Sequence, residues 1–280
     1  MQEFAGKAAF VTGAASGIGF ALSEAFARVG MKVMLADIES EALNAAVDGL
    51  RALAPSIAGV ICDVSDAASV ARAAETTFGT FGNVHVLCNN AGVAGGSGID
   101  NISLDNWRWV LDVNMMGVLH GVHAFLPHMQ AHGEGGHIVN TASMAGFQSD
   151  LGFSPYATSK YAVVAMSEGL ALQLNPMGIG VSVLCPDFVR TRIADSNRNR
   201  PERYGAARKN DPASAAGQLT ATIAQLLQDG LDPVIVANKT LAAIRAEELY
   251  VFTHPEARGA VDRRFAAIQA ALDKAGRRSS

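Results

Sequence analysis

The sequence predicts a doubly wound α/β fold, in which helices cover both faces of a parallel sheet. Three observations predict it: short apolar segments alternate with longer helical segments, these apolar segments contain few polar residues, and a glycine-rich turn follows the first of them. Strands that are buried on both faces read as continuous apolar runs, and regular strand–helix alternation is typical of parallel sheets with right-handed crossovers.

The individual elements follow from this alternation. Strands are expected at residues 8–12, 32–36, 58–62, 84–89, 137–141, 180–184 and 249–253. Helices are expected at about 17–29, 40–53, 66–79, 103–132, 155–175, 219–229, 233–246 and 255–273. No linker-like stretch interrupts the first 190 residues, so residues 1–280 are expected to form a single domain around a sheet of about seven strands.

The pattern changes after the sixth predicted strand. Residues 195–217 are polar and contain prolines and glycines that interrupt regular structure. We interpret residues of about 190–230 as a flap over the carboxyl ends of the strands, where open α/β sheets bind ligands. The basic side chains of residues 195–217 are Arg198, Arg200, Arg203, Arg208 and Lys209. They fit a solvated, flexible lid, or a lid that brings an arginine to a cofactor phosphate or an acidic substrate group. Residues 274–280 are expected to be a disordered tail.

Composition and charge argue against several classes of protein. Hydrophobic residues make up 49% and charged residues 17% of the 280-residue chain, enough for a large buried core. A net charge of −4 gives no general attraction to nucleic acid or to an anionic membrane, and no apolar run approaches the roughly 20 residues of a membrane span. The N-terminus lacks the features of a signal peptide, and Cys62, Cys88 and Cys185 lack metal-site spacing. We therefore expect a cytoplasmic protein with buried, reduced thiols and no metal, nucleic-acid or membrane partner.

The glycine-rich turn at residues 12–19 indicates phosphate binding. Gly13, Gly17 and Gly19 follow the first strand and open the first helix, where glycine permits a tight turn and a close approach of the backbone to a pyrophosphate. The helix N-terminus offers free N–H groups and a positive dipole. A glycine-rich strand–helix turn without a ligand is the alternative.

A tyrosine and a lysine on one helix face point to proton transfer. Tyr156 and Lys160 are four residues apart, and Ser143 lies thirteen residues upstream of the tyrosine. A phenol has a pKa of about 10, and a neighbouring ammonium group favours the phenolate. A serine hydroxyl can hold a substrate oxygen. Together these groups can move a proton on or off an alcohol while a dinucleotide takes or gives a hydride.

Asp37 favours NAD over NADP as that dinucleotide. Its carboxylate ends the second predicted strand, where it can accept hydrogen bonds from the adenosine ribose and would repel a 2′-phosphate. Ala14, Ala15, Ser16 and Ile38 supply no positive charge to tolerate that phosphate. The alternative is an exposed aspartate that caps the next helix.

Taken together, these motifs resemble the classical short-chain dehydrogenase/reductase family, from residue 5 to about 273, with a Rossmann-type fold. The resemblance rests on the turn at 12–19, on Asn89, Asn90, Ala91 and Gly92, and on Asn114, Ser143, Tyr156 and Lys160, all in family order. It implies that Tyr156 is the general acid or base and that Ser143 binds the substrate oxygen. It implies that Lys160 lowers the pKa of Tyr156 and binds the nicotinamide ribose. Asn114 would bend its helix and support a water beside Lys160, and the hydride would be pro-S.

The resemblance also implies a set of cofactor contacts. They are Gly13, Ser16, Gly17, Ile18, Gly19, Asp37, Ile38, Asp63, Val64, Asn90, Ala91, Gly92, Tyr156, Lys160, Pro186, Val189 and Thr191. Asp63 and the Val64 backbone would hold the adenine, although a local turn or cap is an alternative for Asp63. Val189 and Thr191 would contact the nicotinamide carboxamide. Asp187 stands where the family has glycine, and its effect on loop geometry or substrate preference is left open.

The C-terminal third is similar to a bacterial subgroup that includes dehydrogenases of benzylic secondary alcohols in lignin-derived aryl ethers. This similarity lies in residues 192–195, 200–205 and 249–256. It implies an NAD-dependent oxidoreductase that interconverts a bulky, apolar or aromatic secondary alcohol and its ketone. The expected substrate contacts are Ser143, Phe147, Phe153 and Phe188, with Leu151 as a further lining residue. A homodimer or homotetramer would form through the helices at 103–132 and 155–175. The alternatives are a 3-oxoacyl-type reductase and a non-catalytic dinucleotide-sensing protein.

Overall fold

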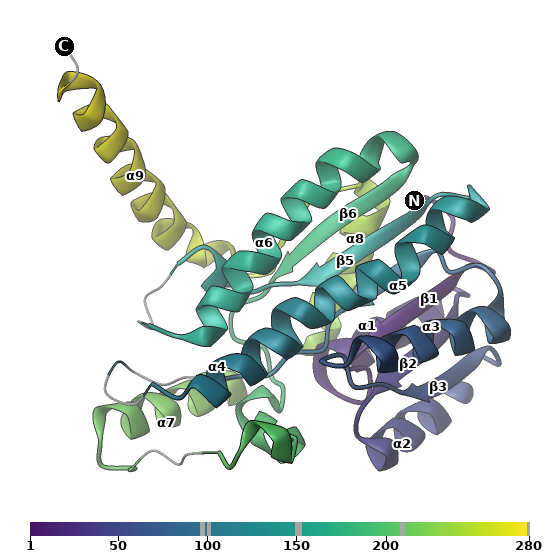
Figure 1. Cartoon of the computed structure of the whole chain (residues 1–280). Coiled ribbons are helices and arrows are strands. Elements are labelled where there is room, and N and C mark those ends of the chain that lie inside the picture. The colour runs from purple at the N-terminus through teal and green to yellow at the C-terminus, as the bar shows by residue number, and fades with distance from the viewer. Residues whose placement is uncertain (96–98, 100–101, 149–152, 208–210, 279–280) are drawn as a thin grey trace.

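The computed structural model describes residues 1–280 except 96–98, 100–101, 149–152, 208–210 and 279–280. A parallel sheet runs through the molecule in the order β3-β2-β1-β4-β5-β6-β7 (Figure 1). Its strands are β1 (Ala8–Thr12), β2 (Lys32–Asp37), β3 (Ile57–Ile61), β4 (Val86–Asn89), β5 (Gly136–Thr141), β6 (Ile179–Cys185) and β7 (Tyr250–Phe252). The predicted seven-stranded, doubly wound sheet is confirmed.

Helices cover both faces of this sheet. One face carries α1 (Gly17–Arg28), α2 (Ser40–Arg51) and α8 (Pro233–Ala246), and the other carries α3 (Ala67–Phe81), α5 (Gly117–His132) and α6 (Pro155–Leu174). The five inner strands are almost completely buried, as in Phe10, Val11 and Leu87, which explains their continuous apolar sequence, whereas the edge strands β3 and β7 are partly exposed. The core therefore consists of two apolar layers, one on each face of a single sheet.

The long helix expected at residues 103–132 is interrupted. It consists of α4 (Leu104–Leu111), a π-helical turn η2 (Asp112–Met116) and α5. Asn114 lies within η2, and its side chain forms hydrogen bonds outside its own helix. A π-helical turn inserts an extra residue into the helix and is frequent at functional sites. The Asn114 side chain therefore lies at the break in the helix and bonds to the loop after β4 and to α6.

The flap contains more regular structure than its sequence predicts. It forms the short 3₁₀ helices η5 (Ile193–Asn199) and η6 (Glu202–Tyr204), and then α7 (Ala215–Gln228). Ser214 caps α7 by accepting a hydrogen bond from the Gly217 N–H, so this helix begins earlier than expected. Arg208 and Lys209 lie outside the described residues.

The final helix is longer than expected. α9 (Arg258–Arg278) includes most of the segment for which a disordered tail was expected, and it projects away from the body of the molecule (Figure 1). Residues 279–280 of that tail lie outside the described residues. Among the residues that the structure describes, no helix has both the length and the apolar character to cross a membrane.

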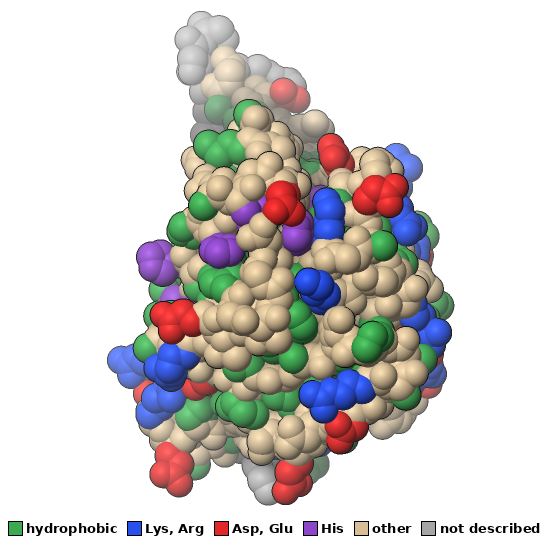
Figure 2. All heavy atoms as spheres, turned by 90° about the vertical axis from the view of Figure 1, so that its right-hand side faces the viewer, with side chains coloured by type: hydrophobic (Ala, Val, Ile, Leu, Met, Phe, Trp, Pro, Cys, Tyr) green, Lys and Arg blue, Asp and Glu red, His purple; other side chains and the backbone are tan. Residues whose placement is uncertain are grey.

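The surface and the thiols agree with the composition. Basic and acidic side chains are interspersed on the face in Figure 2, without a large field of one sign. Cys62, Cys88 and Cys185 are buried and unpaired. Burial raises the pKa of the Cys62 and Cys185 thiols to about 12, so they remain protonated and unreactive at neutral pH.

Candidate active site

The turn between β1 and α1 is built for close approach to a ligand. Gly13 and Gly17 have φ angles of +63° and +56°, a region that favours glycine. A Cβ atom on Gly19 would lie 2.1 Å from the Gly13 carbonyl oxygen, and one on Gly13 would lie 2.9 Å from the Ala91 Cα. Ser16 precedes α1 and its side chain makes no cap hydrogen bond, so the Ser16 hydroxyl does not occupy the N–H groups of the first turn. The residues present therefore fit a dinucleotide pyrophosphate.

Asn90 joins the ends of three neighbouring strands. Its Nδ2 donates to the Thr12 carbonyl at 3.0 Å, and its Oδ1 accepts a hydrogen bond from the Thr141 hydroxyl at 3.3 Å. The Thr12 hydroxyl accepts from the N–H groups of Asn90 and Ala91 at 2.9 and 3.0 Å. Thr12 thereby shapes the predicted cofactor edge, a role that its sequence position alone did not reveal.

Asp37 is held in place by backbone groups on both sides. Its Oδ2 accepts a hydrogen bond from the Ala15 N–H at 2.9 Å, and its Oδ1 accepts one from the Glu39 N–H at 3.0 Å. The carboxylate is buried at 8% exposure, and Glu39, not Asp37, is the residue that precedes α2. The alternative of an exposed helix cap is therefore wrong for Asp37. Ile38, beside it, is 39% exposed.

Asp63 forms a local turn, which was the alternative to its expected contact with adenine. Its Oδ1 accepts from the Ser65 N–H and hydroxyl, and its Oδ2 pairs with Arg203 of the flap at 3.0 Å. Burial alone would raise the pKa of Asp63, but the hydrogen bonds from Ser65 and Arg203 outweigh it and hold that pKa below its usual value. The Val64 carbonyl accepts from His120 Nδ1 at 2.9 Å. Contact of Asp63 and Val64 with adenine stays a prediction.

The start of α6 brings the three chemical groups together. Ser154 caps this helix by accepting a hydrogen bond from the Tyr156 N–H, and Pro155 occupies the first turn. Both fix where the helix begins, and so the position of Tyr156. Lys160 lies one turn later, and its Nζ is 5.5 Å from the centroid of the Tyr156 ring. Ser143 follows β5, and its side chain lies close enough to the Tyr156 phenol to lower the pKa of that phenol. The structure thus assembles the predicted triad.

Burial dominates the electrostatics of this triad. It raises the pKa of Tyr156, the hydrogen bond with Ser143 opposes the rise, and the charge of Asp187 adds to it. Burial also lowers the pKa of Lys160 to about 8, and its Nζ donates to the Thr141 carbonyl at 2.8 Å. The expected lowering of the Tyr156 pKa by Lys160 is not seen in this structure, because burial and the charge of Asp187 raise that pKa.

Asn114 connects the loop after β4 to α6. Its Oδ1 accepts from the Val93 N–H at 2.8 Å, and its Nδ2 donates to the Val93 carbonyl and the Ser159 hydroxyl at 3.0 and 3.1 Å. Gly92 lies beside it: a Cβ there would be 3.4 Å from Asn114 Oδ1 and 3.6 Å from Lys160 Nζ. The side chain thus positions two parts of the site, and the predicted water beside Lys160 remains a prediction.

The loop after β6 is braced by His254, a residue to which the sequence analysis assigned no role at the site. His254 Nδ1 accepts a hydrogen bond from the Asp187 N–H, and His254 Nε2 donates to the Phe188 carbonyl, both at 3.1 Å. The signal was positional, since His254 follows β7, whose carboxyl end lies beside that of β6. Burial raises the pKa of the Asp187 carboxyl, while His254 opposes this rise. Asp187 therefore adds a partly buried carboxyl group near Tyr156.

The remaining cofactor positions lie along the same loop. The Pro186 carbonyl accepts a hydrogen bond from the Met144 N–H at 2.8 Å. Val189 is buried and forms a bridge with Leu231, and a Cβ atom on Gly17 would lie 3.0 Å from the Thr191 Cγ2. The loop therefore lies against the glycine-rich turn. The expected nicotinamide contacts are thus next to the expected pyrophosphate site, as binding of one dinucleotide requires.

The predicted substrate phenylalanines have different environments. Phe147 is buried in a core cluster, and its ring centroid is 5.3 Å from that of Phe252. Phe153 is 50% exposed and lies 4.9 Å from the Trp107 ring, which the sequence did not single out. Phe188 is partly exposed in the loop after β6. Phe147 thus packs in the core, its contact with substrate stays a prediction, and Leu151 lies outside the described residues.

Comparison with known proteins identifies the family. The profile of the short chain dehydrogenase family matches residues 7–202. The chain belongs to this family, whose members bind a nicotinamide dinucleotide, and it is an oxidoreductase of the short-chain alcohol dehydrogenase type.

Individual relatives are consistent with the bacterial subgroup inferred from sequence. The chain is 34% identical over 269 residues to the C alpha-dehydrogenase of Sphingobium sp. (strain SYK-6), covering 96% of this chain and 87% of that one. It is 34% identical over 193 residues to the cyclohexanol dehydrogenase of Acinetobacter sp. (strain SE19), covering 69% and 76%. A short chain dehydrogenase/reductase from Burkholderia phymatum, solved in complex with NAD, superposes with a TM-score of 0.92 at 41% identity and covers 97% of each chain.

Proposed function

We propose that this protein is an NAD-dependent dehydrogenase that interconverts a bulky, apolar or aromatic secondary alcohol and its ketone. The observation that carries the proposal is the grouping of Ser143, Tyr156 and Lys160 beside the glycine-rich turn, at the carboxyl edge of the sheet. These groups supply a hydrogen-bond donor, a proton carrier and a cation, which are the requirements for proton transfer at an alcohol oxygen.

The chain's own residues would perform the proton transfer. In oxidation, the Tyr156 oxygen accepts the hydroxyl proton of the alcohol, and in reduction it returns that proton to the carbonyl oxygen. The Ser143 hydroxyl holds the same oxygen and stabilises the charge that develops on it. Lys160, anchored to the Thr141 carbonyl, stabilises the phenolate through its positive charge. A bound nicotinamide supplies the hydride acceptor or donor.

We propose NAD as the preferred cofactor because of the charge beside Asp37. The carboxylate is fixed by the Ala15 and Glu39 N–H groups, so it cannot easily turn away from a 2′-phosphate. Its position at the end of β2 suits hydrogen bonds from the ribose hydroxyls. The NAD complex of the Burkholderia phymatum relative supports this preference.

The substrate class is proposed from the aromatic side chains near α6. Phe153, immediately before the helix that carries Tyr156, and Trp107 of α4 form a partly exposed aromatic pair. Aromatic rings prefer to pack against other rings in offset or edge-to-face geometry. The name of the Sphingobium relative, a C alpha-dehydrogenase, supports a benzylic alcohol.

We also propose a homodimer or homotetramer that forms through α5 and α6. Leu119 on α5 and Leu172 on α6 are large apolar side chains at the surface, with 45% and 82% exposure. Light scattering of the protein and of Leu172→Glu tests this: a lower mass for the variant is expected, and a monomeric wild type would contradict the proposal.

The first experiment measures NADH formation at mildly alkaline pH with aliphatic, cyclic and aryl secondary alcohols, supplying NAD and NADP in parallel. We expect turnover of aryl or bulky alcohols, with a higher kcat/KM for NAD. Tyr156→Phe should lower kcat by about 10²–10⁴-fold without weakening NADH binding, because only the proton carrier is removed.

Other outcomes would favour the alternatives. A higher efficiency with NADP, together with reduction of 3-oxoacyl substrates, would indicate a reductase of that type. Tight NADH binding without turnover of any alcohol would indicate a dinucleotide-sensing protein.

A further inference from the structure

Residues 192–204, which we call the strap, cross the carboxyl edge of the sheet. The Ser196 hydroxyl accepts a hydrogen bond from the Ala94 N–H after β4 at 3.0 Å. Farther along, the strap contacts Glu39 after β2, Asp63 after β3 and Asp112 in η2. One short segment is therefore tied to the loops that follow three strands.

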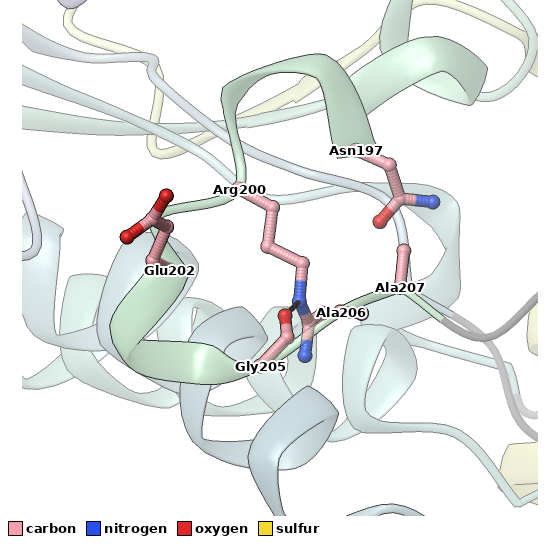
Figure 3. Close-up of a pocket in the computed structure, with 6 residues that line it drawn as sticks. All are labelled: Asn197, Arg200, Glu202, Gly205, Ala206 and Ala207. Carbon is pink, nitrogen blue, oxygen red and sulfur yellow. Dashed lines mark hydrogen bonds between the residues drawn. The ribbon is translucent and has the colours of Figure 1, made fainter.

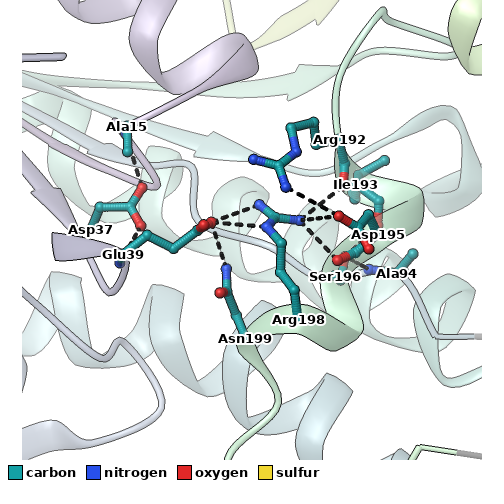
Figure 4. A network of polar contacts seen from close by, with 10 residues as sticks. All are labelled: Ala15, Asp37, Glu39, Ala94, Arg192, Ile193, Asp195, Ser196, Arg198 and Asn199. Atoms are coloured by element: carbon teal, nitrogen blue, oxygen red, sulfur yellow. Dashed lines mark hydrogen bonds and ion pairs between the residues drawn. The ribbon is translucent and has the colours of Figure 1, made fainter. Parts of the chain in front are cut away.

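The first anchor is an ion pair across the end of β2 (Figure 4). Arg198 donates from Nε and Nη2 to Glu39 Oε1 at 3.1 and 2.7 Å, and Asn199 Nδ2 donates to the same oxygen at 2.8 Å. Arg198 Nη1 also donates to the carbonyls of Arg192 and Asp195 within the strap. Because both charged side chains are about three-quarters buried, the arginine is held in one orientation.

The second anchor lies at the end of β3. Arg203 Nη2 donates to Asp63 Oδ2 at 3.0 Å and to the Ser65 hydroxyl at 2.7 Å. The buried Tyr204 next to it donates its hydroxyl hydrogen to Asp112 Oδ2 at 2.9 Å. The strap is thus fixed to carboxylates at its middle, through Arg198, and at its C-terminal end, through Arg203 and Tyr204.

Arg200 stabilises the strap itself and does not mark a separate ligand site. A hollow of about 290 Å³ is lined by Arg200, by two other strap residues and by residues 205–207, which follow the strap (Figure 3). The guanidinium donates to the carbonyls of Tyr204 and Gly205 and to Asn106 Oδ1, and it lies 4.8 Å over the Trp109 ring. Its three donor nitrogens are already used within the protein.

We propose that the strap is a latch over the adenosine half of the cofactor site, and that its ion pairs set the rate at which the dinucleotide leaves. This inference rests on the proposed function. Glu39 lies two residues after Asp37, and Asp63 is itself an expected adenine contact, so both anchors flank the adenosine positions. A dinucleotide bound there leaves only after the strap separates from these loops.

The anchors have the strength that a reversible latch requires. Each pair is partly exposed, so each contributes modestly and is weakened by salt. Arg198–Glu39 is the better probe, because Glu39 is not among the expected cofactor contacts, whereas Arg203→Ala would also free Asp63.

The test measures NADH dissociation directly, by stopped-flow displacement of NADH fluorescence with excess NAD at low and high salt. The proteins are wild type, Arg198→Ala, Glu39→Gln, the double variant, and Arg28→Ala as control, which breaks the surface pair with Glu24 on α1. We expect dissociation to be about 3- to 10-fold faster in each single variant. The double variant should be no faster than the singles, because both remove the same interaction.

Salt should accelerate NADH release from the wild type and from Arg28→Ala, and have a smaller effect on the double variant, which retains only the second anchor pair, Arg203–Asp63. Equal dissociation rates and equal salt dependence in all five proteins would overturn the latch while leaving the proposed function standing. Failure of the wild type to bind NADH would overturn both.

Discussion

At the scale of one residue, Lys160 is a site residue whose burial lowers the stability of the fold. The side chain is 2% exposed, and its ammonium group donates to the neutral Thr141 carbonyl. A neutral acceptor replaces only part of the lost hydration, so burial lowers the pKa of Lys160 to about 8. A lysine in such a position is retained for its charge and not for its contribution to folding.

We therefore predict that Lys160→Met stabilises the fold while abolishing activity. The pKa of Lys160 is 10.5 in the unfolded chain and about 8 in the folded one, so between these values the unfolded chain binds the extra proton. Wild-type stability should rise as the pH increases through this window, and the methionine variant should lack that rise. Urea unfolding should show the variant about 1–3 kcal/mol more stable at pH 7, with the gap closing by pH 10. A variant that is less stable than the wild type at both pH values would contradict this account.

At the scale of elements, the β1–α1 turn depends on glycine for space. Gly19→Ala would place a Cβ atom 2.1 Å from the Gly13 carbonyl oxygen, so the turn must shift. We expect NADH affinity to fall at least tenfold, as measured by fluorescence titration, because the phosphate-binding N–H groups move with the turn.

Gly79→Ala is the matched control for this change. Gly79 lies within α3, and nothing lies within 4 Å of its Cβ position. Alanine there should leave NADH affinity unchanged and stabilise the helix by about 0.5–1 kcal/mol. Equal effects of the two substitutions on affinity would show that the turn tolerates a side chain.

The π-helical turn gives a second prediction at this scale. Asn114→Ala removes two hydrogen bonds to Val93 and one to Ser159, and it leaves buried backbone groups unpaired. We expect a loss of about 1–3 kcal/mol in the free energy of unfolding and a fall in kcat. Asn83→Ala, which removes an exposed bond to Glu134, should change neither by a comparable amount. Full activity of Asn114→Ala would show that catalysis does not depend on the hydrogen bonds of the Asn114 side chain.

Elements were predictable to the extent that their patterns are local. Apolar runs located the strands, and residue types located Ser143, Tyr156 and Lys160, because few side chains can carry that chemistry. The break at Asn114 was less visible, since a π-helical turn has no periodicity of its own. The brace from His254 to Phe188 joins residues 66 positions apart, and Phe147 is assigned to packing only by its neighbours from β7.

At the scale of the whole molecule, the parallel sheet explains where the site forms. All strands point the same way, so the loops that follow them meet at one edge and bring the glycine turn, Asp37, Ser143 and His254 together. The alternation of elements predicted that edge, and the change of pattern after the sixth strand predicted a flap over it, but not the contacts that hold the flap. The strap ion pair between Arg198 and Glu39 joins residues 159 positions apart, and only the fold creates it.

The projecting helix α9 can be shortened to test which part of it contributes to the stability of the fold. The start of α9 contacts the body, since Val261 packs on a core cluster and Arg264 lies 5.2 Å over the Tyr161 ring. Farther along, Phe265, Ile268 and Leu272 are exposed. Removing residues 266–280 should therefore leave NADH affinity unchanged and shift Tm by no more than about 2–4 °C, the effect of roughly 1 kcal/mol in a protein of this size.

A chain that ends at residue 248 should behave differently, because it also loses β7 and His254. Val251 is 4% exposed and pairs with Leu184 of β6, while His254 braces the loop that carries Asp187 and Phe188. This shorter chain should lose NADH binding and should not unfold cooperatively in a calorimetric scan. Without β7, strand β6 becomes an unprotected edge of the sheet, and without His254 the loop after β6 loses its support. If both truncations unfold alike, α9 is part of the cooperative unit; if both remain folded and bind NADH, β7 and His254 do not hold the site.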